Sequence, residues 1–345
     1  MTSRKKRTHF TAIDLFSGCG GTTVGLKQAG YRVLCAVELA SAPMRAYAAN
    51  HPEVLLKKED IRNINCAQML RDLKLEKGEL DLLAGCPPCQ GFSTMRTKNG
   101  KILVHDDRNN LVQQFYRFTR SFLPKAVMLE NVPGLKDSEE FSDFVRKMRK
   151  LGYLGEWKIL NAKDFGVPQR RRRLIYVAGY KKHLSADAEV LPEISVRSAI
   201  SELPEPGNSG DKLHDLPERR SEHIQRMISL VPKDGGSRTD LPDEFVLPCH
   251  KKRTDGFKDV YGRMAWEKPS PTITGGCASP SKGRFLHPEK DRCITLREAA
   301  VLQGFPVDYK FPEPLNKADL ALMIGNALPA PFIHAHASKI ADVLS

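Results

Sequence analysis

Two cysteines lie on a turn that follows an apolar stretch of the sequence. Residues 80–84 predict a buried strand, and directly after it Cys86 and Cys89 flank Pro87 and Pro88. Proline fixes φ and removes a backbone donor, so this turn would present a thiol on a stiff support. Cys89 is placed like a nucleophile and Cys86 is its competitor. The simplest alternative is that both are small buried hydrophobes, the usual state of free cysteine.

A glycine-rich turn follows another apolar stretch near the start of the chain. Gly18, Gly20 and Gly21 permit a tight strand-to-helix turn and a close approach of the backbone to a ligand. Glu38 ends the next apolar stretch, where an acidic side chain can accept hydrogen bonds from ribose hydroxyls. Taken alone, a packing turn and a surface glutamate explain these residues equally well.

A carboxylate and a run of arginines complete the chemically informative residues. Glu130 follows the apolar stretch 126–129, where its carboxyl could hold a proton on a substrate. In residues 170–173, alternation along a strand would send Arg171 and Arg173 to one face. The alternatives are a salt-bridged glutamate at a strand end and a solvated or phosphate-binding basic patch.

Alternating strand and helix patterns occupy the first half of the chain. Strands separated by helices predict an α/β fold with a mostly parallel, doubly wound sheet, in which ligands bind beyond the carboxyl ends of the strands. The expected strands are 12–16, 31–37, 54–56, 80–84 and 126–129, with 157–160 and 174–177 as a terminal pair. The expected helices are 21–29, 41–50 (with Ser41 as N-cap), 109–122, 138–151, 296–302, 317–324 and 331–344.

The periodic pattern breaks down in residues 191–266, where prolines, glycines and charges dominate. A structureless loop of that length is improbable inside a compact domain, so we expect a second, smaller irregular domain. The predicted boundaries are 8–190 plus 318–345 for the main domain and 191–317 for the smaller one.

The composition favours a polyanionic partner. The chain of 345 residues has 54 basic and 41 acidic residues, a net charge of +13, and phosphate neutralisation by such a surplus releases counterions. The eight cysteines show no zinc spacing, so no metal is expected. Without a recognisable signal peptide or an apolar run of membrane length, we expect a cytoplasmic protein with reduced thiols and no membrane contact.

Five motifs in chain order resemble the motif set of the DNA (cytosine-5)-methyltransferases of bacteria. They lie at residues 14–21, 85–93, 130–132, 169–173 and 325–329. The resemblance implies a Rossmann-like methyltransferase domain. It also implies transfer of a methyl group to carbon 5 of a flipped-out cytosine in a specific duplex sequence.

The resemblance also implies catalytic roles. Cys89, in the family's Pro-Cys-Gln pattern, would add to carbon 6 of the base, which decides between the two thiols. Glu130 would bind ring nitrogen 3 and the exocyclic amine, while Arg171 and Arg173 would orient the base and the active-site loop.

The implied cofactor is S-adenosylmethionine, which becomes S-adenosylhomocysteine, and no metal takes part. Phe16 would contact the adenine, Glu38 the ribose, and Asp60 would lie near the adenine amino group. The full set of cofactor residues implied is Asp14, Phe16, Gly18, Gly20, Gly21, Glu38, Asp60, Ile61, Pro88 and Asn326.

Double-stranded DNA is the implied partner, and residues 191–266 fall where the family carries its target-recognition region. The DNA-contacting candidates are Gln90, Ser93, Arg171, Arg238, Lys252 and Arg263. A single recognition segment predicts one target sequence, read by a monomer that is either a solitary methylase or the partner of a restriction endonuclease.

Three rival functions remain open. One branch of the same family methylates tRNA cytosine, and a relative could bind DNA without catalysis, although the intact Cys89 and Glu130 argue against loss of activity. A nicotinamide oxidoreductase would need the GxGxxG spacing, which the turn at Gly18 lacks.

Overall fold

The computed structural model describes residues 9–88, 111–246, 259–313 and 315–345, which form two compact units. The first unit comprises residues up to 165, 172–190 and 328–345, and the second comprises 166–171 and 191–327. The predicted boundary at 317/318 differs from this division, because the helix that follows it packs within the second unit. A Cβ on Gly325 would meet Thr274 there.

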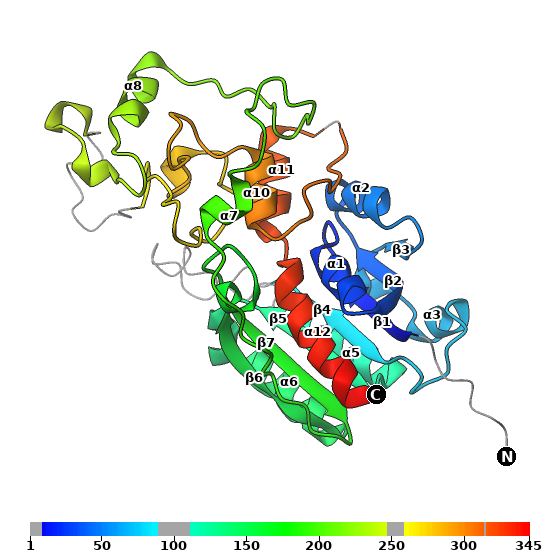
Figure 1. The fold of residues 1–345 in the computed structure, drawn as a ribbon. Helices are drawn as coiled ribbons and strands as arrows, with labels where there is room; N and C mark the ends of the chain where they lie inside the picture. Colours follow the sequence, from blue (N-terminus) through cyan, green and yellow to red (C-terminus); the bar gives the residue numbers. More distant parts are fainter. Residues whose placement is uncertain (1–8, 89–110, 247–258, 314) are drawn as a thin grey trace. The chain divides into compact units, whose positions relative to one another are not determined.

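In the described part of the first unit, seven strands form one sheet in the order β3-β2-β1-β4-β5-β7-β6 (Figure 1). All neighbouring pairs from β3 to β5 are parallel, and β7 runs antiparallel to both β5 and β6. This confirms the predicted α/β class. The strands are β1 (Phe10–Leu15), β2 (Tyr31–Glu38), β3 (Leu55–Lys58), β4 (Leu82–Gly85), β5 (Ala126–Asn131), β6 (Tyr153–Asn161) and β7 (Arg172–Tyr180).

Side chains of each strand point alternately to the two faces of the sheet, so each face carries apolar residues that helices can cover. The main core joins Ile13, Leu15, Leu83 and Leu129 to phenylalanines of two helices. The longer helices of this unit are α1 (Gly21–Gln28), α2 (Ser41–Asn50), α3 (Cys66–Asp72), α5 (Leu111–Phe122), α6 (Glu139–Lys150) and α12 (Ala330–Leu344). Short 3₁₀ turns are η1 (Ile61–Asn63), η3 (Pro133–Asp137) and η4 (Ala162–Phe165).

Helices α1 and α12 lie in close contact (Figure 1). A Cβ on Gly21 would stand 2.3 Å from the carbonyl oxygen of Leu328, and one on Gly25 2.4 Å from that of Ala330. Only glycine permits backbones to approach so closely. These two glycines therefore fix the last helix against the turn that follows β1.

The expected N-cap at Ser41 is wrong. The helix α2 begins at Ser41 itself, and the N-cap position is Ala40, which has no side chain able to cap. The carboxylate of Glu38 accepts hydrogen bonds from the amides of Leu39 and Ala40. It thus fixes the backbone entering the helix, a role that the residue-by-residue pattern of the helix itself does not reveal.

The second unit is irregular, with α7 (Val196–Ile200), α8 (Glu222–Leu230), α10 (Leu296–Leu302), α11 (Lys317–Asn326) and the 3₁₀ turns η5 (Arg238–Asp240), η6 (Asp243–Phe245) and η7 (Pro280–Lys282). Its loops need donors for their carbonyl groups, since few of these groups lie in regular structure. Arg263, with no exposed surface, donates to the carbonyls of Ile228, Val231, His287 and Lys290 and pairs with Asp291.

Arg263 is therefore a correction to the DNA-contacting candidates. A guanidinium with 0% exposure and this many internal acceptors cannot reach a phosphate without disrupting the packing of its own unit.

Among the described residues of both units, no helix is both long and apolar enough to span a membrane.

Candidate functional site

The predicted site residues of the first unit gather at one edge of the sheet. The parallel strands β1, β2, β4 and β5 end at this edge, and the antiparallel β7 begins there. Phe16, Glu38, Cys86, Glu130 and Arg173 all stand at these strand ends. The expectation that the motifs share the carboxyl edge is met for these described residues.

Glu130 is the centre of a buried polar cluster. Its side chain is 2% exposed, and its Oε1 lies 2.8 Å from Nε of Arg173. Its Oε2 accepts a hydrogen bond from the Cys86 thiol at 2.6 Å. Burial makes an unpaired polar atom costly, and here Arg173 and Cys86 supply partners to the two carboxyl oxygens.

Asn131 links the end of β5 to the residues after β4, a contact that sequence reasoning did not single out. Its Nδ2 donates to the carbonyl oxygen of Pro87 at 2.8 Å, and its Oδ1 accepts from the amide of Val132. The available signal was a short polar side chain beside Glu130 at a strand end. The bond fixes the start of the segment that contains Cys89, which itself lies outside the described residues, as do Gln90 and Ser93.

The turn after β1 contains three residues with a left-handed backbone. Phe16 has φ 60°, Gly18 55° and Gly20 102°, all in the left-handed region. A bulky residue in that region is strained, and such strain concentrates at functional sites. A Cβ built on Gly18 would meet no atom within 4 Å, so the turn borders open space.

Glu38 links this turn to the start of α2. Its Oε2 accepts from the amide of Gly18 at 2.8 Å, while its Oε1 accepts from the two amides before the helix. The next residue, Leu39, is 63% exposed and offers an apolar side chain beside this turn. Sequence reasoning missed Leu39, although an apolar residue after a strand-end acid was visible.

Asp14 is buried at the same end of β1. Its Oδ2 accepts from the Thr23 hydroxyl at 2.8 Å, and that hydroxyl also contacts the hydroxyl of Tyr47. Its Oδ1 has no hydrogen-bond partner among the described residues. Burial raises the pKa of Asp14 to about 7, since desolvation disfavours the charged form.

The other predicted cofactor residues are spread over both units. Asp60 is the N-cap of η1 and is bound by the guanidinium of Arg62, which holds its pKa below the usual value. Ile61 is buried and Pro88 is exposed. Asn326 is the last residue of α11 in the second unit, and its cofactor role stays a prediction.

Gln169 and Arg171 lie in the second unit, before β7 begins. Arg171 is 4% exposed and donates to the carbonyls of Ile273, Gly325 and Ala327. Gln169 donates to the carbonyl of Leu302 and accepts from the amide of Ile273. The predicted contacts of Arg171 with the base and with DNA stay predictions.

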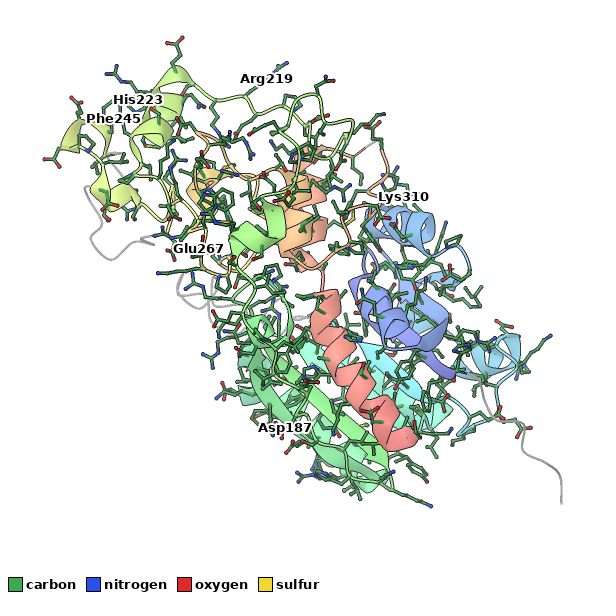
Figure 2. All side chains as sticks on the ribbon, in the orientation of Figure 1. Asp187, Arg219, His223, Phe245, Glu267 and Lys310 are labelled. Atoms are coloured by element: carbon green, nitrogen blue, oxygen red, sulfur yellow. The ribbon has the colours of Figure 1, made fainter. Side chains whose placement is uncertain are left out.

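The second unit also presents cationic side chains at its surface. The ring centroids of His223 and Phe245, both labelled in Figure 2, are stacked 5.9 Å apart, and the Arg226 guanidinium lies 5.6 Å from the Phe245 centroid. Arg238 begins η5, and Lys252 lies outside the described residues. Arg226 was not among the sequence-based candidates, because its pairing with Phe245 joins distant segments.

The fold is Rossmann-like and of the methyltransferase type: a mostly parallel sheet has a glycine turn after its first strand and a carboxylate at the end of its second. The C-5 cytosine-specific DNA methylase family matches residues 10–342, and the chain belongs to this family. It is thus a DNA cytosine-5 methyltransferase, as the motif resemblance predicted.

Bacterial relatives agree over nearly the whole chain. The Type II methylase M.HgiDII of Herpetosiphon aurantiacus is 34% identical, over 92% of this chain and 91% of the relative. The Type II methyltransferase M1.BsuMI of Bacillus subtilis is 33% identical, over 92% of this chain and 77% of the relative.

Solved structures share the fold. A DNA modification methyltransferase encoded within an Escherichia coli prophage has a TM-score of 0.70 at 25% identity, with 97% of this chain and 99% of the other covered. The methyltransferase EhMeth of Entamoeba histolytica has a TM-score of 0.68 at 18% identity, with 98% and 100% covered.

Proposed function

We propose that this enzyme methylates carbon 5 of a flipped-out cytosine within one specific duplex sequence, using S-adenosylmethionine and a covalent Cys89 adduct. One observation carries the proposal. A buried carboxylate, Glu130, is held by Arg173 at the edge where the Cys89 segment starts. The proposal gives Cys89 the role of nucleophile and Glu130 that of the acid–base group.

The chemistry requires both groups. Carbon 5 of cytosine is a weak nucleophile, but addition of a thiolate to carbon 6 gives the ring enamine character, so carbon 5 can attack an electrophilic methyl group. The carbon 5 proton then leaves to a base, and the C–S bond breaks as the thiolate departs. Glu130, hydrogen bonded at nitrogen 3, stabilises the charge that develops during addition.

The residues at the end of β1 fit the cofactor. S-adenosylmethionine supplies the electrophilic methyl group and carries an ammonium group, a ribose and an adenine. The unpartnered Oδ1 of Asp14 suits a cation, and Glu38 suits ribose hydroxyls. The strained Phe16 and the exposed Leu39 offer apolar surface for the adenine.

The net charge of the chain and its relatives support double-stranded DNA as the partner. The net charge of +13 favours a polyanion, and the target base must leave the stack to reach a buried carboxylate. The relatives' names include Type II methylases, so we infer action beside a cognate restriction endonuclease in a bacterial cytoplasm. The enzyme would act as a monomer, with residues 191–266 reading the sequence.

The first test is a methylome. The wild-type chain is expressed in a methylation-deficient bacterium, and bisulfite sequencing maps 5-methylcytosine in its DNA and tRNA. We expect methylation confined to one short DNA motif and absent with the Cys89→Ser variant. Methylation of tRNA alone, or substantial DNA methylation by Cys89→Ser, would contradict the proposal.

A further inference from the structure

We propose that Cys86 is a positioning residue that orients Glu130 through its thiol and yields its place to the incoming base. This inference rests on the proposed function of Glu130 as the group that binds the cytosine ring. Cys86 takes no part in the proposed reaction, and this inference gives its thiol a role.

The sheet register places Cys86 beside Glu130. Gly85 of β4 pairs with Leu129 of β5 in parallel, so the residues that follow each of them are neighbours. Cys86 donates to Glu130 at 2.6 Å, and Pro87 accepts from Asn131 at 2.8 Å. Two consecutive residues leaving β4 are thus tied to two consecutive residues of β5.

The backbone of Cys86 is fixed independently of its side chain. Its amide donates to the carbonyl oxygen of Leu15 at 3.3 Å, which continues the β4 register with β1. The thiol therefore points to Glu130 from a fixed support on the sheet. A cysteine that merely filled space would have no need of a buried carboxylate as its acceptor.

The two oxygens of the carboxylate have different partners. Oε1 faces Nε of Arg173, and Oε2 faces the Cys86 sulfur. The last torsion of a glutamate is broad, so a carboxylate held at one oxygen can still swing. Contacts at both oxygens fix its plane in the orientation that the base must meet.

A thiol is suited to a temporary role at Oε2. Its S–H is a weak donor, weaker than the exocyclic amine that cytosine would present to the same oxygen. The base can therefore displace it at small cost, whereas an ammonium or guanidinium there would compete. Cys86 satisfies the buried oxygen before the base arrives.

The test compares Cys86→Ala, which removes the donor, with Cys86→Ser, which keeps one. Because the alanine variant leaves Oε2 without its donor and frees the carboxylate to swing, we expect a loss of about tenfold in the single-turnover rate of methyl transfer. The serine variant should stay within about threefold of wild type, since it retains the bond. Dissociation constants for DNA and for S-adenosylmethionine should change little in either variant.

A matched control is Cys66→Ala, which removes a buried thiol at the start of α3 in the same unit. We expect it to leave the rate unchanged. A readout without catalysis is the infrared S–H stretch. The wild-type protein should show a hydrogen-bonded band that Cys86→Ala removes and that Glu130→Ala shifts to higher frequency.

Two results would overturn the inference. One is a Cys86→Ala enzyme as fast as wild type, and the other is a serine variant as slow as the alanine variant at equal thermal stability. A wild-type chain that methylates no cytosine would instead refute the proposed function, and the infrared band would still decide whether the thiol binds Glu130.

Discussion

Two buried carboxylates, Glu130 on β5 and Asp14 on β1, differ in the partners of their oxygens. Glu130 has a guanidinium at one oxygen and a thiol at the other. Asp14 has the Thr23 hydroxyl at Oδ2 and no described partner at Oδ1. Glu130 thus has a partner at each oxygen, whereas burial disfavours the charged form of Asp14 and raises its pKa.

The free energy of unfolding should therefore depend on pH through Asp14. The ordinary pKa of an aspartate is 3.8, and burial raises that of Asp14 to about 7, so folding takes up a proton between these values. Stability then falls as the pH rises through this window and levels off above it. Relative to wild type, Asp14→Asn should gain thermal stability as the pH is raised from about 5 to about 8.

Thermal unfolding of both proteins without cofactor, across this range, measures the effect. Asp137→Asn, at an exposed carboxylate, is the control and should follow the wild-type curve. Parallel curves for Asp14→Asn and wild type would show that burial does not shift the pKa of Asp14 as described.

At the scale of elements, strands were predictable and the contacts between elements were not. Apolar stretches such as 80–84 and 126–129 located β4 and β5, because burial demands continuous hydrophobic residues. The bonds from Cys86 to Glu130 and from Asn131 to Pro87 depend on strand register, which one sequence does not specify. The cap of α2 was mispredicted for a similar reason, since its support comes from Glu38.

Gly25 tests the contact between α1 and α12. Alanine favours helix by about 1 kcal/mol over glycine. Here, however, its Cβ would stand 2.4 Å from the Ala330 carbonyl oxygen and 2.7 Å from Cβ of Ile333. Overpacking costs about 1–3 kcal/mol, so we expect Gly25→Ala to lower the free energy of unfolding.

Urea denaturation measures this change. Gln28→Ala, at the exposed last residue of α1, is the control and should be neutral or slightly stabilising. A Gly25→Ala protein more stable than wild type would mean that the two helices separate easily.

At the scale of the whole molecule, the second unit could not be predicted from hydrophobic periodicity, because most of its segments are irregular. Arg263, Arg171 and Gln169 satisfy backbone carbonyls from distant segments and so replace regular hydrogen bonding. Basic residues in an irregular region suggest DNA contact, which is how Arg263 was misassigned. Burial, which only the fold reveals, separates supporting arginines from available ones.

We expect the methylated target sequence to change when residues 191–266 are exchanged. Replacing them with the equivalent segment of a relative should change the methylated motif found by bisulfite sequencing. The replacement should retain Arg263, because its acceptors His287 and Lys290 lie outside the exchanged segment. An Arg263→Ala graft, expected to be insoluble, is the control for folding, and an unchanged motif would place recognition elsewhere.

The pairing of α1 with α12 has a consequence for the newborn protein. The glycine face of α1 leaves the ribosome early, but its cover, around Leu328, Ala330 and Ile333, is translated only after the whole second unit. Throughout that interval the turn at Gly18 lacks its finished support. The first unit can therefore complete its packing around α1 only when the last part of the chain has been made.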